Sequence, residues 1–170
     1  MEQERAIAAL VAELEQAHGE FVAALNDVDP ALATAPGLVG EWSARELVAH
    51  MGYWSGHAAE ALHLAVAGRL AEFGEPQLDV DARNETVARV ARESDYPLVL
   101  AREESSYLAF LDRLRALDPA LLSERAPYGA SLEHIVREDG AEHYREHTAH
   151  LREWWSAGAS EDEADDGNGE

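Results

Sequence analysis

Residues 142–150 read EHYREHTAH and carry three histidines, His143, His147 and His150. Steps of three and four residues bring side chains to one face of an α-helix, so the three imidazoles share a face. Apolar residues on the same face predict that it points into a core. Polar histidines in the middle of a helix face that points into the core indicate a functional site as well as packing. The other members of the face are Leu132, Val136, Asp139 and Trp154.

Residues 40–54, GEWSARELVAHMGYW, show the same feature on a second predicted helix. Ser43 followed by Glu46 has the form of a capping box, which predicts a helix from residue 43 to about residue 68. His50 lies on the inward face of this helix. A buried imidazole without hydrogen-bond partners costs roughly 1–3 kcal/mol. One metal ion shared between the two helices would satisfy several imidazoles at once.

The remaining residues predict two further helices and a long connection. Apolar residues at helical spacing predict helices over residues 2–27 and from about residue 100 to residue 118, and the helix with three histidines covers about 131–156. Residues 73–97 are polar and bordered by prolines, which predicts a crossover with at most one short helix. No strand pattern or glycine-rich phosphate loop is present. We therefore predict an all-α four-helix bundle.

The length and composition predict one folded domain. The chain has 170 residues, of which 46% are hydrophobic, enough for a single core. We expect the bundle domain to cover residues 1–157. Residues 158–170 are rich in acid and poor in apolar side chains, which predicts a disordered tail.

The charge balance bears on the classes of partner. The chain has 34 acidic and 13 basic residues, for a net charge of −21, and the sequence shows no basic patch. Because such a charge repels phosphate backbones and anionic lipid, we expect no nucleic acid and no membrane as partners. The N-terminal residues lack the apolar run of a signal peptide, and no later stretch is apolar enough for a membrane span. We therefore expect a cytoplasmic protein.

His50, His143 and His147 form the predicted metal site. Histidines at positions i and i+4 project side by side from a helix, and a third histidine from a facing helix completes a set of three nitrogen ligands. Three protein ligands leave positions open for water or substrate, which is typical of catalytic sites. The alternative is that these histidines only form hydrogen bonds within the core or line a polar cavity. The chain has no cysteine, so it offers neither thiolate ligands nor a cysteine nucleophile.

Three further residues are candidates for a catalytic role. Asp139 lies one turn before His143 and Tyr53 one turn after His50, so either could orient a ligand imidazole or a substrate. His150 could line the pocket, support a ligand or carry protons. A solvated acid is an equally good interpretation of Asp139, and a packing role is the simpler interpretation of Tyr53.

Other histidines are expected to have structural roles. His57 lies two turns from His50, roughly 10 Å along the helix, too far to share its ion. We interpret His57 as a hydrogen-bonded core or interface residue, and His63 and His134 as surface residues. His18 belongs to the inward face of the first helix, with no local support for ligation.

The segments around His50 and around His143 and His147 resemble the DinB-like superfamily of four-helix bundles. The resemblance rests on the tryptophan before a helix cap, the histidine seven residues after Ser43, and the late H-x-x-x-H helix. It implies up-down-down-up connectivity, a homodimer, and a divalent metal held by the three histidines. The metal implied is nickel or zinc, with iron or manganese as alternatives. Similar proteins include transferases and isomerases that depend on a low-molecular-weight thiol.

Three classes of function remain open from the sequence. The first is a metal-dependent enzyme, a thiol S-transferase or a hydrolase, that activates a small thiol or water against a small electrophile as its substrate. The second is a bundle that binds a metal or small ligand without chemistry. The third is a structural bundle in which the histidines only pack. We rank them in this order.

Overall fold

The computed structural model describes residues 2–74 and 79–165, with side chains described for 5–74 and 79–158. The long helices of the bundle are α1 (Glu2–Asp27), α2 (Ala44–Val66), α4 (Tyr96–Arg115) and α6 (His143–Asp165), the last preceded by the short α5 (Leu132–Arg137). A further helix, α3 (Val80–Arg92), lies in the connection between α2 and α4. Among the described residues, β-structure is limited to two isolated bridges. The predicted all-α bundle is confirmed.

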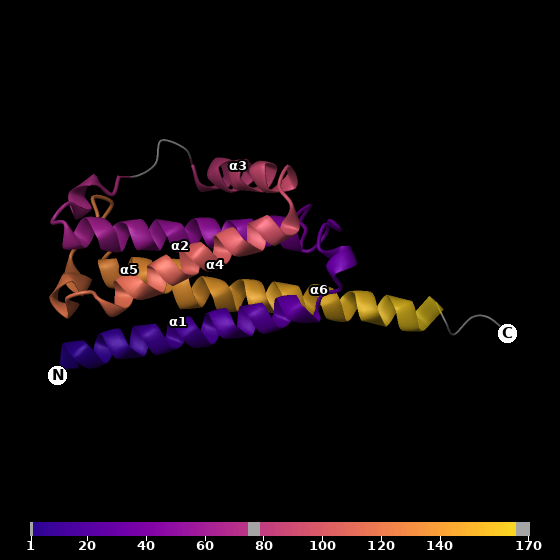
Figure 1. Ribbon diagram of the computed structural model, residues 1–170, viewed down its shortest axis with the longest axis horizontal. Coiled ribbons are helices and arrows are strands. Elements are labelled where there is room, and N and C mark those ends of the chain that lie inside the picture. Colours follow the sequence, from indigo (N-terminus) through magenta and orange to yellow (C-terminus); the bar gives the residue numbers. More distant parts are fainter. Residues whose placement is uncertain (1, 75–78, 166–170) are drawn as a thin grey trace.

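The connectivity is up-down-down-up, as the resemblance implied. Figure 1 shows α2 antiparallel to α1, and α4 running in the same direction as α2. Two parallel neighbours need a connection that returns along the full length of the bundle, and residues 67–95 provide it, with α3 passing over α2. α5 and α6 then run back parallel to α1. This arrangement places α3 beside the outer face of α2, where it helps to enclose a cavity.

The start of α2 follows from its capping residues. The Glu46 side chain accepts a hydrogen bond from the backbone N–H of Ser43 at 2.7 Å and another from the Ser43 hydroxyl. The Ser43 side chain in turn accepts a hydrogen bond from the backbone N–H of Glu46. This capping box satisfies donors that the first turn of a helix leaves without partners. The helix ends at Val66, shortly before Gly68, which has φ +68°. Cap and glycine therefore set both ends of the helix that carries His50.

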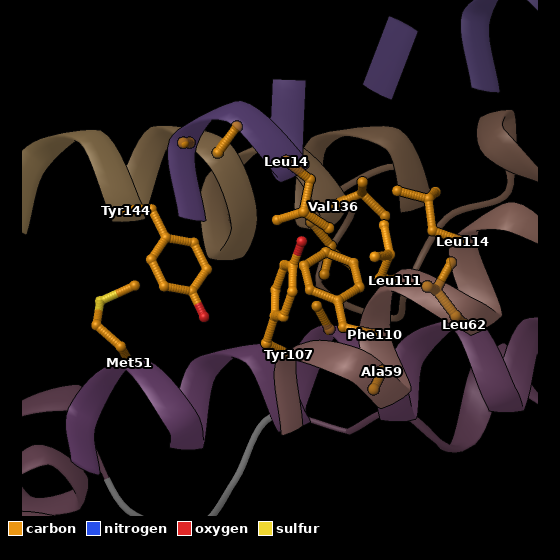
Figure 2. Packing of buried hydrophobic residues seen from close by; sticks show 14 of the residues in the cluster. Leu14, Met51, Ala59, Leu62, Tyr107, Phe110, Leu111, Leu114, Val136 and Tyr144 are labelled. Atoms are coloured by element: carbon orange, nitrogen blue, oxygen red, sulfur yellow. The ribbon is translucent and has the colours of Figure 1, made fainter. Parts of the chain in front are cut away.

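The core lies between α1, α2, α4 and the C-terminal helices. Figure 2 shows Tyr107 and Phe110 of α4 and Tyr144 of α6 extending into the space between the helices, with Leu14 of α1 beside them. Phe110, Leu14 and Tyr144 are fully buried or nearly so. Burying each such side chain contributes roughly 1.5–3 kcal/mol. The core therefore holds α2 and α6 in the register that brings their histidines together.

The fourth helix of the bundle is interrupted, which differs from the continuous helix predicted over 131–156. A π-helical segment, Glu138–Glu142, joins α5 to α6, and Gly140 in it has φ −103° and ψ −114°. A Cβ at Gly140 would lie 3.1 Å from Phe110 Cε1, so a side chain there would press on the Phe110 ring of α4. α6 also extends past residue 156 to Asp165. The domain boundary at 157 and the disordered tail stay predictions, and residues 166–170 lie outside the described part of the chain.

Within the described residues, no helix combines the length and the apolar character needed to cross a membrane.

Candidate metal centre

The three predicted ligands come together between α2 and α6. One ligand nitrogen from each of His50, His143 and His147 lies within 4.8 Å of the other two. The Nε2 atoms of His50 and His143 are 2.8 Å apart, although the residues are 93 positions apart in the chain. The ring centroid of His50 lies 4.8 Å from that of His143 and 4.9 Å from that of His147. The fold therefore builds a three-nitrogen cluster.

Burial keeps these imidazoles neutral. Burial lowers the pKa of His50 to about 3, the charge of His143 lowers it further, and the side chain of Asn84 acts to raise it. Burial lowers the pKa of His143 to about 4. The pKa of His147 falls to about 2, mainly through burial and then through repulsion by the neighbouring histidines. Neutral imidazole is the form that binds a metal ion.

The cluster fits a divalent cation. The contact between the two Nε2 atoms requires one nitrogen to carry a proton and the other to accept it, so a protonated pair is excluded. The Nδ1 atom of His50 is buried and has no hydrogen-bond partner among the described residues. Three neutral imidazoles suit zinc and nickel, which favour nitrogen ligands. His50, His143 and His147 are therefore the residues that would hold the ion.

A cavity of about 440 Å³ opens beside the cluster, and both His50 and His143 line it. Its size is that of a small-molecule site. α3 supplies Val80, Arg83 and Asn84 to one wall, and α2 supplies Trp54 and His57 to another. The Trp54 indole N–H donates to Asn84 Oδ1 at 3.1 Å, which ties α3 to α2. The remaining walls include Gly74, Tyr128, Ile135, Glu138, Asp139 and Glu146.

Asp139 lies in this cavity wall, and its hydrogen bond among the described residues is to His57 rather than to a predicted ligand. Its side chain is buried, and its Oδ2 atom is 2.7 Å from Nδ1 of His57. Burial raises the pKa of Asp139, while the hydrogen bond and charge of His57 act in the opposite direction. Asp139 is therefore not a solvated acid, and its role in orienting a ligand imidazole or a substrate stays a prediction. His57 is hydrogen-bonded, as expected, and its partner is a carboxylate in the cavity wall.

His150 and Tyr53 lie outside the cavity. The Nδ1 atom of His150 is 3.1 Å from Nδ1 of His147, so His150 lies beside a ligand. Tyr53 instead lines a second cavity, between α2, α3 and α4. The Arg83 guanidinium carbon is 5.9 Å from the Tyr53 ring centroid. His150 therefore lies beside a predicted ligand and Tyr53 faces another cavity, and a catalytic role for either residue stays a prediction.

Two residues of the cavity were not anticipated. Arg83 is 7% exposed and lies over the Trp54 ring at 5.3 Å, and Asn84 holds the Trp54 indole. Both come from the crossover, whose polar pattern predicted only a connection. No local spacing distinguishes them, because their position depends on how α3 packs on α2. The sequence offered only a weak signal for Arg83 and Asn84, namely two adjacent polar residues in a segment where at most one short helix was predicted.

Solved structures with this fold come from bacteria. An uncharacterised protein from Escherichia coli UTI89 aligns with a TM-score of 0.77 at 15% identity, covering 90% of this chain and 94% of that chain. The colibactin self-resistance protein ClbS, solved in complex with a dsDNA, aligns with a TM-score of 0.75 at 16% identity, covering 88% and 95%. A protein from Streptococcus pneumoniae aligns with a TM-score of 0.70 at 10% identity, covering 88% and 90%. No curated protein matches the sequence.

The expectation that excluded nucleic acid as a partner is wrong. ClbS has the same fold and was crystallised with dsDNA, so this fold does not exclude nucleic acid. The physical reason is that net charge describes the whole surface, whereas binding depends on the local potential at one site. A total of −21 therefore cannot decide the partner class by itself.

The sequence comparison agrees with the fold and with the position of the histidines. Residues 14–153 match the mycothiol maleylpyruvate isomerase N-terminal domain, and this range includes the three histidines of the cluster. The match covers most of the chain, from the middle of α1 into α6. The chain therefore belongs to the mycothiol maleylpyruvate isomerase N-terminal domain family, within the DinB-like superfamily.

Proposed function

We propose that this protein is a divalent-metal-dependent enzyme that activates a small thiol or water for transfer to, or hydrolysis of, a small electrophile. The observation that carries the proposal is the convergence of one nitrogen each from His50, His143 and His147 within 4.8 Å, beside a cavity of about 440 Å³. A structural metal site is normally closed by four protein ligands, whereas three ligands beside a cavity are typical of catalysis.

The bound ion would supply Lewis acidity, which lowers the pKa of a thiol or water so that a nucleophile exists near neutral pH. The chain itself supplies the geometry. α2 and α6 hold the three imidazoles, and burial keeps them neutral. Trp54 and Asn84 close the cavity on the side of α3. A nucleophilic thiol would have to come from a second small molecule, because the chain has no cysteine.

The first experiment is elemental analysis of the protein purified without a polyhistidine tag. We expect close to one divalent ion per chain, nickel or zinc before iron or manganese, and loss of the ion in His143→Ala. His134→Ala is the matched control, because His134 is exposed and pairs with Glu138 on the same helical face. Absence of metal from the wild type, even after reconstitution, would contradict the proposal.

The second experiment is a turnover screen of the metal-loaded protein with small thiols and electrophiles. We expect turnover that depends on His50, since its loss removes a ligand from across the bundle. Stoichiometric metal without turnover across the panel would favour a bundle that binds a metal or ligand without chemistry. Double-stranded DNA belongs in the same screen as a possible substrate or partner, because ClbS was crystallised with it.

A further inference from the structure

The cavity beside the metal site contains a second polar group, the pair formed by His57 and Asp139. The two side chains come from α2 and from the π-helical segment, and they are 82 positions apart in the chain. Nδ1 of His57 and Oδ2 of Asp139 are 2.7 Å apart, a short distance typical of a charge-assisted hydrogen bond. Both residues line the cavity that is also lined by His50 and His143.

The pair is separate from the metal ligands. His57 and Asp139 are not part of the group of nitrogens within 4.8 Å, and neither forms a hydrogen bond with a ligand histidine among the described residues. Trp54 lies between the two sites, with its ring centroid 5.0 Å from that of His57 and 6.3 Å from that of His50. The cavity thus presents two different chemical groups to one occupant.

The His57 ring is oriented by its surroundings. Trp54 lies on one side, and the Phe73 ring centroid is 4.6 Å away. With Nδ1 engaged by Asp139, Nε2 is the remaining nitrogen, and no described residue forms a hydrogen bond with it. An ionised Asp139 accepts a hydrogen bond from Nδ1–H of the neutral His57 ring, which leaves Nε2 as a bare acceptor. A carboxylate that orients an imidazole in this way is the arrangement of a general base.

We propose that His57 is the general base of this site and that Asp139 positions it. The inference rests on the proposed function, because it needs a nucleophile beside the metal. In the step, the S–H bond of a thiol or the O–H bond of water breaks, and an N–H bond forms at Nε2 of His57. The electron pair stays on sulfur or oxygen, which attacks the electrophile. Asp139 stabilises the imidazolium until the proton passes to the leaving group or to solvent.

The other charged groups of the cavity are consistent with this role. Arg83, Glu138 and Glu146 also line it, and Arg83 acts on Asp139 to lower its pKa. Glu138 pairs instead with His134 at 3.1 Å. Among the described residues, Asp139 is the only carboxylate that contacts His57. A merely structural ion pair would hold the π-helical segment against α2 and would not change the protonation of a bound thiol.

The test measures the number of protons released when a thiol binds, and it needs no electrophile. 2-Mercaptoethanol is titrated into the cobalt-loaded protein by calorimetry near neutral pH, in buffers of different ionisation enthalpy. We expect His57→Gln to release up to about one proton more per bound thiol than the wild type, because the variant lacks the acceptor. Glutamine keeps an N–H donor for Asp139. His134→Gln is the matched control and should release as many protons as the wild type.

A second variant tests the positioning role of Asp139. Asp139→Asn removes the charge and offers an amide donor to Nδ1, which moves the ring proton to Nε2. Nitrogen NMR of the histidine rings should report Nε2 protonated in this variant and bare in the wild type. The variant should also release more protons on thiol binding than the wild type.

The outcomes separate the two proposals. Equal proton release by the wild type and His57→Gln, with cobalt and thiol bound to both, would overturn the base role alone. If the wild type binds no cobalt, the proposed function fails and the base role fails with it. If it binds cobalt but no thiol, the thiol nucleophile is contradicted, and the ring protonation of the wild type and of Asp139→Asn then decides the base role. If His57→Gln does not fold, Asp139→Asn decides, since an Nε2 proton already present in the wild type would contradict the role.

Discussion

At the scale of single residues, the protonation of the three ligand histidines is set mainly by burial. His50 is 5% exposed and His147 6% exposed, and desolvation is the largest cause of each lowered pKa. The folded metal-free protein therefore holds neutral imidazoles where the unfolded chain holds ordinary ones. This difference links the stability of the protein to pH.

The first prediction is that the metal-free protein loses stability as the pH falls below about 6.5, the ordinary pKa of histidine. Below this pH the histidines of the unfolded chain are protonated, whereas the buried histidines of the folded protein stay neutral because their pKa values are lower. The free energy of unfolding therefore decreases. The loss continues toward the folded pKa of His143, about 4. Each histidine contributes up to about 1.4 kcal/mol per pH unit. Urea unfolding across this range measures the loss.

His143→Gln should flatten this pH dependence by the share of one histidine. His134→Gln should leave it unchanged, because His134 is exposed and is not part of the cluster. A wild type whose free energy of unfolding is constant between neutral pH and about pH 5 would show that the site is protonated when folded.

A second residue-scale feature is the buried network around Glu103. Glu103 is 4% exposed and accepts a hydrogen bond from the Tyr144 hydroxyl at 2.5 Å. The Tyr144 hydroxyl also lies 2.8 Å from Ser55 Oγ, and His18 Nε2 is 3.2 Å from the same carboxylate. Burial and the charge of Glu103 raise the pKa of Tyr144, so it stays a donor. The network joins α1, α2, α4 and α6.

The second prediction is that Tyr144→Phe destabilises the protein by roughly 1.5–3 kcal/mol, because a buried carboxylate loses its donor. Tyr107→Phe is the matched control, since no described residue forms a hydrogen bond with the Tyr107 hydroxyl and its ring stacks on His18. Chemical denaturation compares the two. A loss in Tyr144→Phe no larger than that in Tyr107→Phe would show that Glu103 does not depend on this bond.

At the scale of elements, the π-helical segment sets the direction of the side chains before α6. Asp139 lies within it and reaches His57, while His143 begins the next helix and reaches His50. Asp139, His143 and His147 share one face of an ideal helix. The extra residue of a π turn rotates Asp139 away from the direction of His143 and His147. Such π turns are common at functional sites.

The third prediction is that Gly140→Ala destabilises the protein by about 1–3 kcal/mol, because the new Cβ overpacks against α4. It would lie 3.1 Å and 3.2 Å from two ring carbons of Phe110. Gly19→Ala in α1 is the control, since nothing lies within 4 Å of its Cβ, and it should stabilise by about 0.5–1 kcal/mol. Urea unfolding of both variants measures the difference. Stabilisation by Gly140→Ala would contradict the prediction, because it would show that Phe110 of α4 can shift to make room for the new Cβ.

At the scale of the whole molecule, the cluster of His50, His143 and His147 connects the two halves of the chain. His50 comes from α2, before the crossover, and His143 and His147 come from α6, after it. These ligands meet only when the bundle is assembled. A metal ion that binds this cluster therefore stabilises the fold as a whole.

The fourth prediction is that zinc raises the free energy of unfolding by about 2.7 kcal/mol when its free concentration is a hundred times its dissociation constant. Thermal unfolding with zinc and then with a chelator measures the gain and its reversal. His143→Ala should show no gain under the same conditions. An equal gain in that variant would place the ion elsewhere on the chain.

The local sequence predicted the main helices and the three histidines of the cluster. Helix positions follow from apolar spacing and from caps such as Ser43 with Glu46, and these depend on residues three or four apart. His50, His143 and His147 were predictable because an imidazole on a core-facing stripe is costly without a partner. The connectivity, by contrast, came from the resemblance to the DinB-like superfamily.

Tertiary structure alone decided which side chains share the cavity and in what direction they point. His57 and Asp139 are 82 residues apart, and α3 brings Arg83 and Asn84 to the site from a segment that predicted only a crossover. The π turn at Gly140 lies against Phe110 of another helix, a contact that local spacing does not show. Local spacing determines the face of a helix on which a residue lies. Which residue of another helix that face meets is decided by the packing of the complete core.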